Sequence, residues 1–262
     1  MNGDMEPSLR LFESPEAARV YARARPYFHP LVVERVRDIA GIEGLLPFGL
    51  DVGCGTGLST RALRLLAHRV LGTDVSAAML AQAEPMEGVE YALAPAEEQP
   101  IPSESVDVLT ISSAFHWVDR ERFLDESRRV LHPGGLLVVY ENGFWGEMAG
   151  VPEFKAWTQT RHLERMPTPP RRSQLSLDDA PPEGFKPVGS ERYGNSVPFT
   201  HEGLVDYLLT QSNAIVAVES GAFSPQGAEG WLTEETAPFF AGIEGAAEFA
   251  FGGSIHVLAR EP

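Results

Sequence analysis

The segment 49–57, Gly-Leu-Asp-Val-Gly-Cys-Gly-Thr-Gly, constrains the fold of this chain more than any other. An apolar run containing Asp51 leads into an amphipathic stretch through three glycines at alternate positions, Gly53, Gly55 and Gly57. Glycine has no Cβ, so it tolerates positive φ and lets the backbone come close to a ligand. A helix after such a loop directs its free N–H groups toward the same ligand. The segment therefore predicts a strand, a small-molecule binding turn and a helix.

The region around this segment alternates short apolar runs with helical patterns. Strands are expected at 50–52, 70–73, 89–92, 106–112 and 136–140, with helices at 59–67, 77–83 and 120–130. This alternation is typical of a parallel sheet with helices on both faces. Outside it, helices are expected at 15–39 with a break at Pro26 and Pro30, at 153–164, at 201–211 and from 233, and strands at 185–198 and 254–259.

Composition limits the partners and the compartment. The 262 residues include 21 Lys and Arg against 37 Asp and Glu, a net charge of −16. A field of this sign repels nucleic acid and anionic lipid, so neither is an expected partner. No apolar run is long enough to cross a bilayer, and the first residues lack the apolar region of a secretory signal, so we expect a cytoplasmic protein. The single cysteine, Cys54, suits a reducing compartment, and no residue spacing indicates a metal site.

Two other nucleotide-binding motifs also place glycines between a strand and a helix. The dinucleotide fingerprint G-x-G-x-x-G fails here, because the sixth position is Leu58 counted from Gly53 and Thr60 counted from Gly55. A phosphate-binding P-loop fails because no Lys-Ser or Lys-Thr follows. Asp51 at the strand end repels a pyrophosphate and attracts an ammonium group. The motif therefore favours a cationic, amino-acid-like ligand.

Two downstream segments fit the rest of such a ligand. Asp74 ends the second strand about 20 residues after the glycines, where an acidic side chain accepts hydrogen bonds from ribose hydroxyls. The alternative is that Asp74 only caps the next helix. Val75 and Met79 follow at positions suited to pack on a purine. The backbone of Ala96 and the carboxylate of Glu97 are candidates for reading an adenine edge, the alternative being a solvated acidic loop.

Together these segments resemble a known family. Leu50–Gly57, Gly72–Leu80 and Ala96–Pro100 resemble the class I S-adenosylmethionine-dependent methyltransferases. Two further segments, Tyr21–Tyr27 and Ser112–Trp117, resemble the small-molecule group that includes trans-aconitate methyltransferase and the type 11 methyltransferases. The similarity is strong over the first half of the chain and weak over the second.

The resemblance implies a fold and a division of the chain. The fold is Rossmann-like, a mostly parallel seven-stranded sheet with helices on both faces, an antiparallel last strand, an N-terminal lid and a cap insertion. The expected segments are a helical lid at 1–48, a cofactor-binding α/β core at 49–145, a substrate-facing cap at 146–245 and strands that complete the core sheet at 246–262.

The resemblance also implies a role for each matching residue. The three glycines would line the methionine part of the cofactor S-adenosyl-L-methionine, with Asp51 near its ammonium group. Asp74 would hold the ribose, Val75 and Met79 the adenine faces, and Ala96 and Glu97 the adenine edge. Ser112 would lie beside the sulfonium, and Tyr21 and Arg25 would come from the lid. Pro95 departs from the family pattern, which often has Asp there, and proline supplies no backbone donor.

The acceptor side of the reaction is less marked. His116 is the candidate general base if the acceptor is a hydroxyl or an amine, whereas a carboxylate needs none; the alternative is that His116 and Trp117 only pack in the core. Glu141 and Asn142 are further candidates for substrate contact. A carboxylate substrate would need cations in the cap. Arg161, Arg165, Arg171 and Arg172 are candidates, the alternative being that they are solvated beside a loop.

These observations predict a methyltransferase that acts on a small organic acceptor, at an oxygen of a carboxylate or hydroxyl. Two other functions remain open from the sequence. One is a non-catalytic protein of the same fold that binds S-adenosylmethionine and acts as a sensor or scaffold. The other is a nicotinamide-dependent oxidoreductase, which the glycine spacing disfavours. The sequence does not indicate an oligomeric state.

Overall fold

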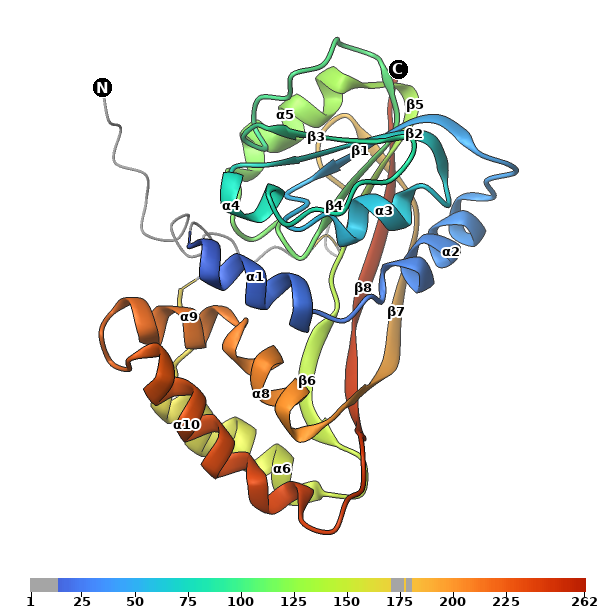
Figure 1. Ribbon diagram of the computed structural model, residues 1–262. Coiled ribbons are helices and arrows are strands. Elements are labelled where there is room, and N and C mark those ends of the chain that lie inside the picture. Colours follow the sequence, from blue (N-terminus) through green and yellow to red (C-terminus); the bar gives the residue numbers. More distant parts are fainter. Residues whose placement is uncertain (1–13, 171–176, 178–180) are drawn as a thin grey trace, which may run out of the picture. The chain divides into compact units, whose positions relative to one another are not determined.

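The computed structural model describes residues 14–170, 177 and 181–262, drawn in colour in Figure 1. They form two compact units. Unit 1 consists of the described residues of 1–26, 143–170 and 194–252, and unit 2 of those of 27–142, 171–193 and 253–262. The first division falls after Pro26, so the two N-terminal helices belong to different units, although the sequence groups residues 1–48 together. The predicted lid and cap boundaries stay predictions.

Unit 2 is built on five parallel strands in the order β3-β2-β1-β4-β5. These strands are β1 (Leu46–Val52), β2 (Ala67–Asp74), β3 (Val89–Leu93), β4 (Val106–Ser112) and β5 (Leu131–Tyr140). The final strand β8 (Ala247–Arg260) pairs antiparallel with β5 through residues 255–259. The order reverses direction between β1 and β4, and ligands of open α/β sheets bind at the carboxyl ends of strands flanking such a point.

The described part of the sheet has eight strands, one more than predicted. The additional pairing comes from β6 (Gly143–Met148), which is antiparallel to residues 249–252 of β8, and from β7 (Phe185–Phe199), which also pairs with β8. The predicted Rossmann-like class, mostly parallel with an antiparallel final strand, is confirmed.

Helices cover both faces of the sheet in unit 2. Successive side chains of a strand point to opposite faces, so neighbouring residues of one strand pack against different helices. In β4, Val108 packs in a cluster with residues of α2 (His29–Ala40) and α3 (Leu58–Leu63). Its neighbour Leu109 packs in a second cluster with residues of α5 (Arg120–Val130). The sheet is therefore apolar on both faces, as the continuous apolar runs of the sequence predict.

Two helices of unit 2 are shorter than predicted. The chain leaves α3 after Leu63 because the carbonyl of Leu66 already accepts the backbone N–H of Leu46 at the start of β1. Helix α4 (Ala77–Leu80) is followed by i to i+3 hydrogen bonds at Gln82 and Ala83, shortly before Pro85. Proline disfavours a helical residue in front of it, which explains the early end.

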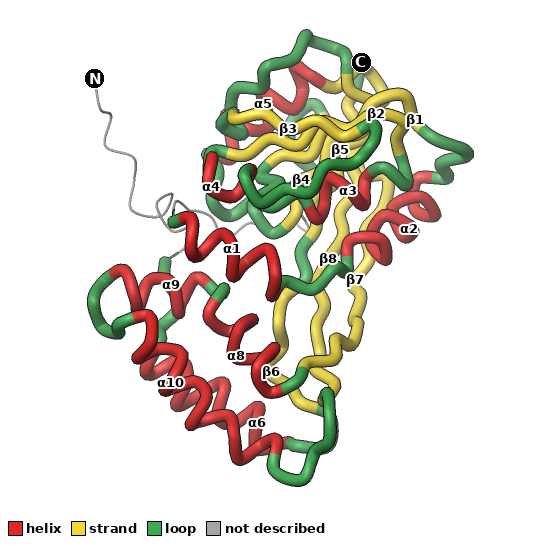
Figure 2. The backbone as a smooth tube through the Cα atoms, viewed as in Figure 1, coloured by secondary structure: helices red, strands yellow, loops and turns green. Residues whose placement is uncertain are grey.

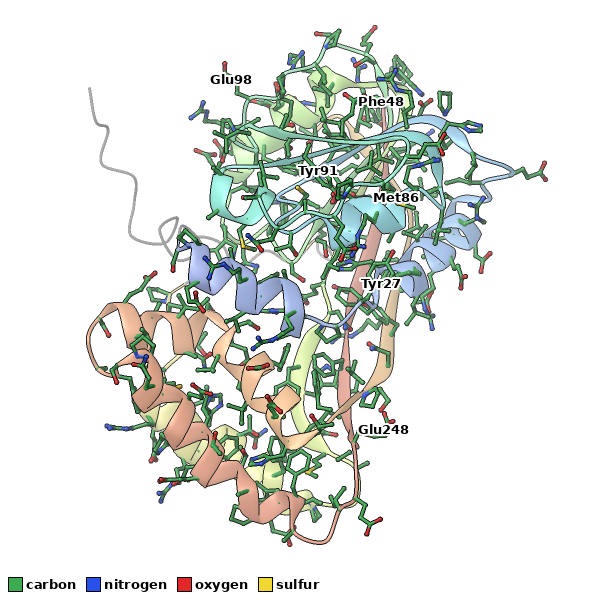
Figure 3. The ribbon with its side chains drawn as sticks, in the orientation of Figure 1. Tyr27, Phe48, Met86, Tyr91, Glu98 and Glu248 are labelled. Atoms are coloured by element: carbon green, nitrogen blue, oxygen red, sulfur yellow. The ribbon has the colours of Figure 1, made fainter. Side chains whose placement is uncertain are left out.

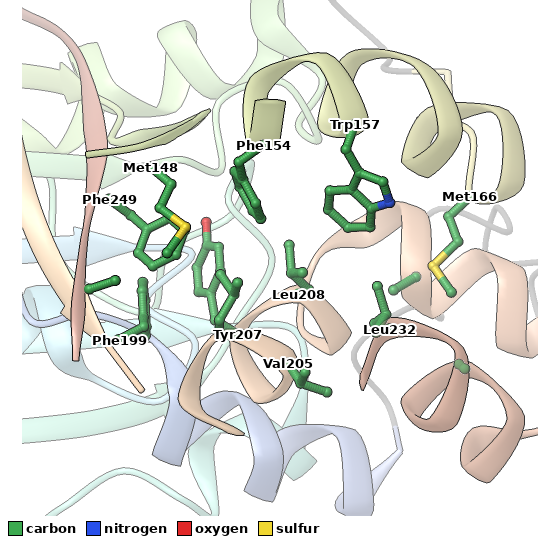
Figure 4. Close-up of a cluster of buried hydrophobic side chains, with 14 of the residues drawn as sticks. Met148, Phe154, Trp157, Met166, Phe199, Val205, Tyr207, Leu208, Leu232 and Phe249 are labelled. Atoms are coloured by element: carbon green, nitrogen blue, oxygen red, sulfur yellow. The ribbon is translucent and has the colours of Figure 1, made fainter. Parts of the chain in front are cut away.

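Unit 1 consists mainly of helices, coloured red in Figure 2, around an aromatic core. The helices are α1 (Pro15–Ala24), α6 (Pro152–Trp157), the π-helix η2 (Thr158–His162), α7 (Leu163–Arg165), α8 (His201–Leu209), α9 (Ser212–Glu219), α10 (Pro225–Thr236) and the 3₁₀-helix η3 (Ala237–Phe240). Figure 4 shows part of the core, in which Phe154, Tyr207 and Phe249 come from α6, α8 and β8. The helix expected from residue 233 instead begins at Pro225, because the Ser224 side chain accepts the N–H of Gly227 and caps it there.

Candidate functional site

The glycine loop after β1 has the backbone that the sequence predicts. Gly53, Gly55 and Gly57 have φ values of +67°, +55° and +79°. A Cβ on Gly53 would lie 2.7 Å from the Cβ of Ala114, and one on Gly57 would overlap the ring of Tyr91. Positive φ and lack of space therefore both require glycine at these two positions. The loop is closed by a hydrogen bond from Gly57 N–H to the Cys54 carbonyl, 2.9 Å.

Asp51, at the end of β1, is fully buried beneath this loop. Its Oδ2 accepts hydrogen bonds from the hydroxyls of Ser59 (2.6 Å) and Thr60 (2.7 Å), and its Oδ1 accepts one from Thr110 (2.7 Å). Burial raises the pKa of Asp51 to about 6 despite these hydrogen bonds, which lower it. The carboxylate thus ties the start of α3 to β4, and its predicted contact with a cofactor ammonium group stays a prediction.

Asp74, at the end of β2, connects two backbone segments. Its Oδ2 accepts the N–H of Gly55 and its Oδ1 the N–H of Ser76, both at 2.8 Å. The cap of α4 is Ser76, whose hydroxyl accepts the N–H of Met79 at 3.2 Å, so Asp74 is not the cap of this helix. Burial raises the pKa of Asp74 against the lowering effect of its backbone donors. A carboxylate has about four acceptor sites, and the backbone donors of Gly55, Val75 and Ser76 use three of them, which leaves capacity for the predicted ribose contact.

The residues predicted to hold the adenine lie on neighbouring loops of unit 2. Val75 is 44% exposed, whereas Met79 is buried with its Cε within 3.2 Å of the Cβ position of Gly55. Ala96 is buried, and Glu97 Oε1 accepts the N–H of Asp119 at 2.7 Å. Glu97 therefore ties its loop to the start of α5, a contact that the sequence did not suggest. The predicted adenine contacts stay predictions.

The tip of β4 carries the residues predicted near the reaction. Ser112 ends the strand beside Tyr140 of β5, and the next residue, Ser113, has a φ of +52°, which is uncommon outside glycine. His116 and Trp117 follow in a turn, with their ring centroids 4.8 Å apart. The strand thus ends at Ser112, and a residue with left-handed backbone precedes the turn that carries His116.

Two buried hydroxyls beside the glycine loop have no hydrogen-bond partner among the described residues. They are Thr56 Oγ1, in the loop itself, and the Oη of Tyr91, labelled in Figure 3. Burial raises the pKa of Tyr91 to about 12, so the phenol is a neutral donor. A buried hydroxyl without a partner costs about 1–3 kcal/mol. The loop therefore fits a polar ligand such as S-adenosylmethionine.

The sequence did not single out Thr56 or Tyr91. Thr56 lies inside the glycine motif, so the sequence could have identified it as a candidate. Nothing in the sequence indicated Tyr91, since its relation to Gly57 depends on β3 lying beside β2.

Some predicted residues belong to unit 1. Arg25 donates from Nη2 to the carbonyl of Thr210 (2.6 Å), and its guanidinium lies over the rings of Tyr21 (4.5 Å) and Tyr207 (5.4 Å). The roles of Tyr21 and Arg25 at a cofactor stay predictions. Arg161 pairs with Glu235, and the guanidinium of Arg165 lies over the Phe223 ring. Arg171 and Arg172 lie outside the described residues.

Comparison with known proteins identifies the family. Residues 50–139 match the family model described as a methyltransferase domain. An uncharacterized methyltransferase of Mycobacterium tuberculosis is 35% identical over 206 residues, which are 77% of this chain and 77% of that protein. This chain belongs to the class I S-adenosylmethionine-dependent methyltransferases.

Solved methyltransferase structures share its fold. A protein described as a type II methyltransferase from Anaeromyxobacter dehalogenans superposes with a TM-score of 0.71 at 22% identity, covering 89% of this chain and 97% of that one. A phosphoethanolamine N-methyltransferase of Haemonchus contortus, in complex with S-adenosyl-L-methionine, has a TM-score of 0.52 at 17% identity and coverages of 99% and 61%. At these identities the likeness shows the fold of the methyltransferase, not its acceptor.

Other curated relatives match this methyltransferase over less of their length. It covers only 36% and 34% of the first two. Their activities therefore do not carry over as a whole. No described helix is long and apolar enough to span a membrane. Among the described residues no three His, Cys, Asp or Glu side chains are grouped as metal ligands.

Proposed function

We propose that this methyltransferase transfers the methyl group of S-adenosylmethionine to a small organic acceptor at oxygen, either a carboxylate or a hydroxyl. The observation that carries the proposal is the glycine loop, with three left-handed glycines and the orphan hydroxyls of Thr56 and Tyr91. When bound, the cofactor supplies a methyl group on a sulfonium that is already reactive. The protein then has to align the acceptor with that group and exclude water.

The residues of unit 2 divide this task. The backbone of Gly53, Gly55 and Gly57 would hold the methionine part, with Thr56 as an added donor or acceptor. Asp74 would bind the ribose with the acceptor capacity that its backbone donors leave free. The half-exposed Val75 side chain offers an apolar surface for the adenine. Ser112 would lie at the reacting end of the site.

The acceptor atom rests on weaker support. The names of related proteins include O-, C- and N-methyltransferases. Oxygen is proposed because a carboxylate needs no base and because His116 is a candidate base for a hydroxyl. We also propose a cytoplasmic location and a small-molecule substrate, which fit the net charge of −16.

Calorimetric titration of the purified protein with S-adenosylmethionine and with S-adenosylhomocysteine tests the cofactor site. Micromolar binding of both is expected, and NAD serves as the negative control. No binding at millimolar cofactor would contradict the proposal. Incubation of a small-molecule cell extract with methyl-labelled cofactor then tests catalysis. Tight binding without a labelled product would favour the non-catalytic sensor or scaffold.

A further inference from the structure

A buried chain of hydrogen bonds runs along one face of unit 2 at the ends of β4 and β5. Ser112 and Tyr140 are paired across these strands, and their side chains are hydrogen-bonded. The Tyr140 hydroxyl in turn shares a hydrogen bond with Nδ1 of His29, in the first turn of α2, at 3.0 Å. The ring of Phe28 packs on His29 with centroids 4.0 Å apart. The side chain of Ser112 is thus anchored through Tyr140 to a buried histidine.

The two titratable groups in this hydrogen-bonded chain, His29 and Tyr140, are both neutral near pH 7. Burial, together with the nearby charge of Arg61, lowers the pKa of His29 to about 3, so its imidazole stays neutral. Burial raises the pKa of Tyr140 well above the usual phenol value, with Asp51, Tyr193 and Tyr27 adding to the effect. Neither group accepts or releases a proton near neutral pH. Ser112 is therefore a fixed, neutral hydrogen-bonding group. His29 and Tyr140 do not act through it as a general base.

Asn142 lies two residues beyond Tyr140 and presents an unused amide. Its Nδ2 and Oδ1 are both buried, and neither has a partner among the described residues. The preceding residue is well fixed, since Glu141 N–H donates to the Ser254 carbonyl at 3.2 Å and its carbonyl accepts the Tyr193 hydroxyl at 2.9 Å. In an extended chain, residues two apart share a face. The orphan Nδ2 donor carries a desolvation cost that an acceptor oxygen of a bound ligand would remove.

We propose that Ser112 and Asn142 form the acceptor site and bind the carboxylate of a small organic acid through neutral hydrogen bonds. The inference rests on the proposed methyl transfer and names its substrate class. A carboxylate is ionised at neutral pH, so one of its oxygens forms the new C–O bond while the methyl–sulfur bond breaks and its electron pair stays on sulfur. No proton moves. An alcohol or ammonium acceptor must lose a proton, and this cluster has no group to take it.

Neutral donors also suit the chemistry better than a cation. A bidentate arginine pair would hold a carboxylate more tightly, but it would lower the charge on the reacting oxygen in the ground state. A hydroxyl and an amide fix the position of the carboxylate and leave more of that charge available.

The nature of the methyl product is the first test. The protein is incubated with methyl-labelled S-adenosylmethionine and a panel of mono- and dicarboxylic acids, each matched by the primary alcohol and primary amine of the same carbon skeleton. The products are then treated with alkali, which releases methanol from methyl esters but not from ethers or methylamines. Alkali-labile label from the acids is expected. Alkali-stable label, or transfer to the alcohols or amines instead, would overturn the carboxylate assignment.

Binding of the same acids to the protein loaded with S-adenosylhomocysteine gives a readout apart from activity. Asn142→Asp keeps the size of the side chain, removes its N–H donor and places a negative charge near the acid. It should weaken acid binding at least about 10-fold and leave S-adenosylhomocysteine affinity and melting temperature unchanged. Binding of acids equal to that of the wild type, or no binding to the wild type at about 10 mM, would overturn the proposal. Failure of the wild-type protein to bind S-adenosylhomocysteine would instead contradict the proposed function.

The pH profile separates this site from base catalysis by His116. With a carboxylic acid as acceptor, kcat/KM should be constant between about pH 7 and 9, because the acid is ionised throughout and so is Asp51, whose pKa is about 6. An inflection between about pH 6 and 7, with kcat/KM falling tenfold per pH unit below it, that His116→Gln removes would show that a neutral histidine is required and would overturn the inference. Tyr140→Phe, which breaks the chain between Ser112 and His29, should lower kcat/KM with an unchanged flat profile.

Discussion

The structure separates the two roles that the sequence allows for Asp74, which are ribose binding and capping of α4. Because Ser76 caps α4 and Asp74 bonds the glycine loop, replacing each tests a different function. Asp74→Ala removes the acceptor for Gly55 N–H and the proposed ribose ligand. Affinity for S-adenosylmethionine, measured by calorimetry, should fall at least about 10-fold, equivalent to about 1.4 kcal/mol.

Ser76→Ala is the matched control for Asp74→Ala. Loss of the cap should lower the free energy of unfolding by about 1 kcal/mol and change cofactor affinity little. If both variants lose stability alike and neither loses affinity, Asp74 only holds the loop together and does not bind the ribose.

His162 is a buried polar residue that the proposed reaction does not use. It ends the π-helix η2 with its ring stacked 5.1 Å from that of Trp157, and neither ring nitrogen has a partner among the described residues. Burial lowers its pKa to about 4. A lowered pKa means that folding favours the neutral ring, so this stability is present above about pH 6.5 and is lost as the pH falls toward 4.

His162→Phe should remove this pH dependence while keeping the stacked ring. Between pH 7.5 and 5 the wild-type protein should lose about 2 kcal/mol of unfolding free energy through His162, and the variant should not. Urea unfolding followed by tryptophan fluorescence is a suitable measurement, because Trp145, Trp157 and Trp231 all lie in unit 1. At pH 7.5 the variant should be at least as stable. Equal loss in both proteins would show that His162 is not the titrating group.

At the scale of elements, the glycine loop depends on backbone conformation as much as on space. Gly57→Ala meets both a φ of +79° and the ring of Tyr91. Gly41, which ends α2 at a φ of +61°, has no atom within 4 Å of its Cβ position. A substitution there therefore measures the cost of the positive φ without a steric overlap. Gly41→Ala should cost about 1–2 kcal/mol of unfolding free energy and leave cofactor binding intact. Gly57→Ala should cost more and abolish measurable binding; equal stability losses with binding retained would argue against close backbone approach to the cofactor.

The elements that the sequence predicted well are those with continuous apolar runs. Strands β1 to β5 and helices α1, α2 and α5 lie where their patterns placed them, because burial on a sheet or a helix face sets the pattern. Strand β6 was not predicted, since Gly143–Met148 reads Gly-Phe-Trp-Gly-Glu-Met and is neither alternating nor apolar. The early ends of α3 and α4 depend on a tertiary hydrogen bond and on a proline.

The candidate site was predictable where chemistry is local in the sequence. The glycines and Asp74 lie where the motif indicated, but the hydroxyl partners of Asp51 come from α3 and β4 together. Tyr91, Tyr140 and His29 gave no signal, because a lone aromatic residue acquires its role only when strands from distant segments pair. Sequence spacing identifies the glycine loop and is silent about the side chains that other segments bring to the same sheet.

At the scale of the whole molecule, the net charge of −16 acts on the two ligands in opposite directions. S-adenosylmethionine carries one net positive charge and is attracted, whereas a carboxylate acceptor is repelled at long range. Salt screens such fields, with a Debye length of about 10 Å at 0.1 M. Raising the salt from about 20 to about 200 mM should therefore weaken S-adenosylmethionine binding and increase kcat/KM for the acid, each by about 2–5-fold.

S-adenosylhomocysteine is the matched control for this salt prediction, since it fills the same site without net charge and its affinity should barely change. Stopped-flow association rates with either cofactor, and initial rates with the acid at saturating cofactor, measure the effects separately. If kcat/KM for the acid instead falls with salt, a locally positive surface outweighs the net charge. Acid recognition would then include arginines in addition to the neutral groups Ser112 and Asn142, because only fixed positive charge near the acceptor's path reverses the sign of the salt dependence.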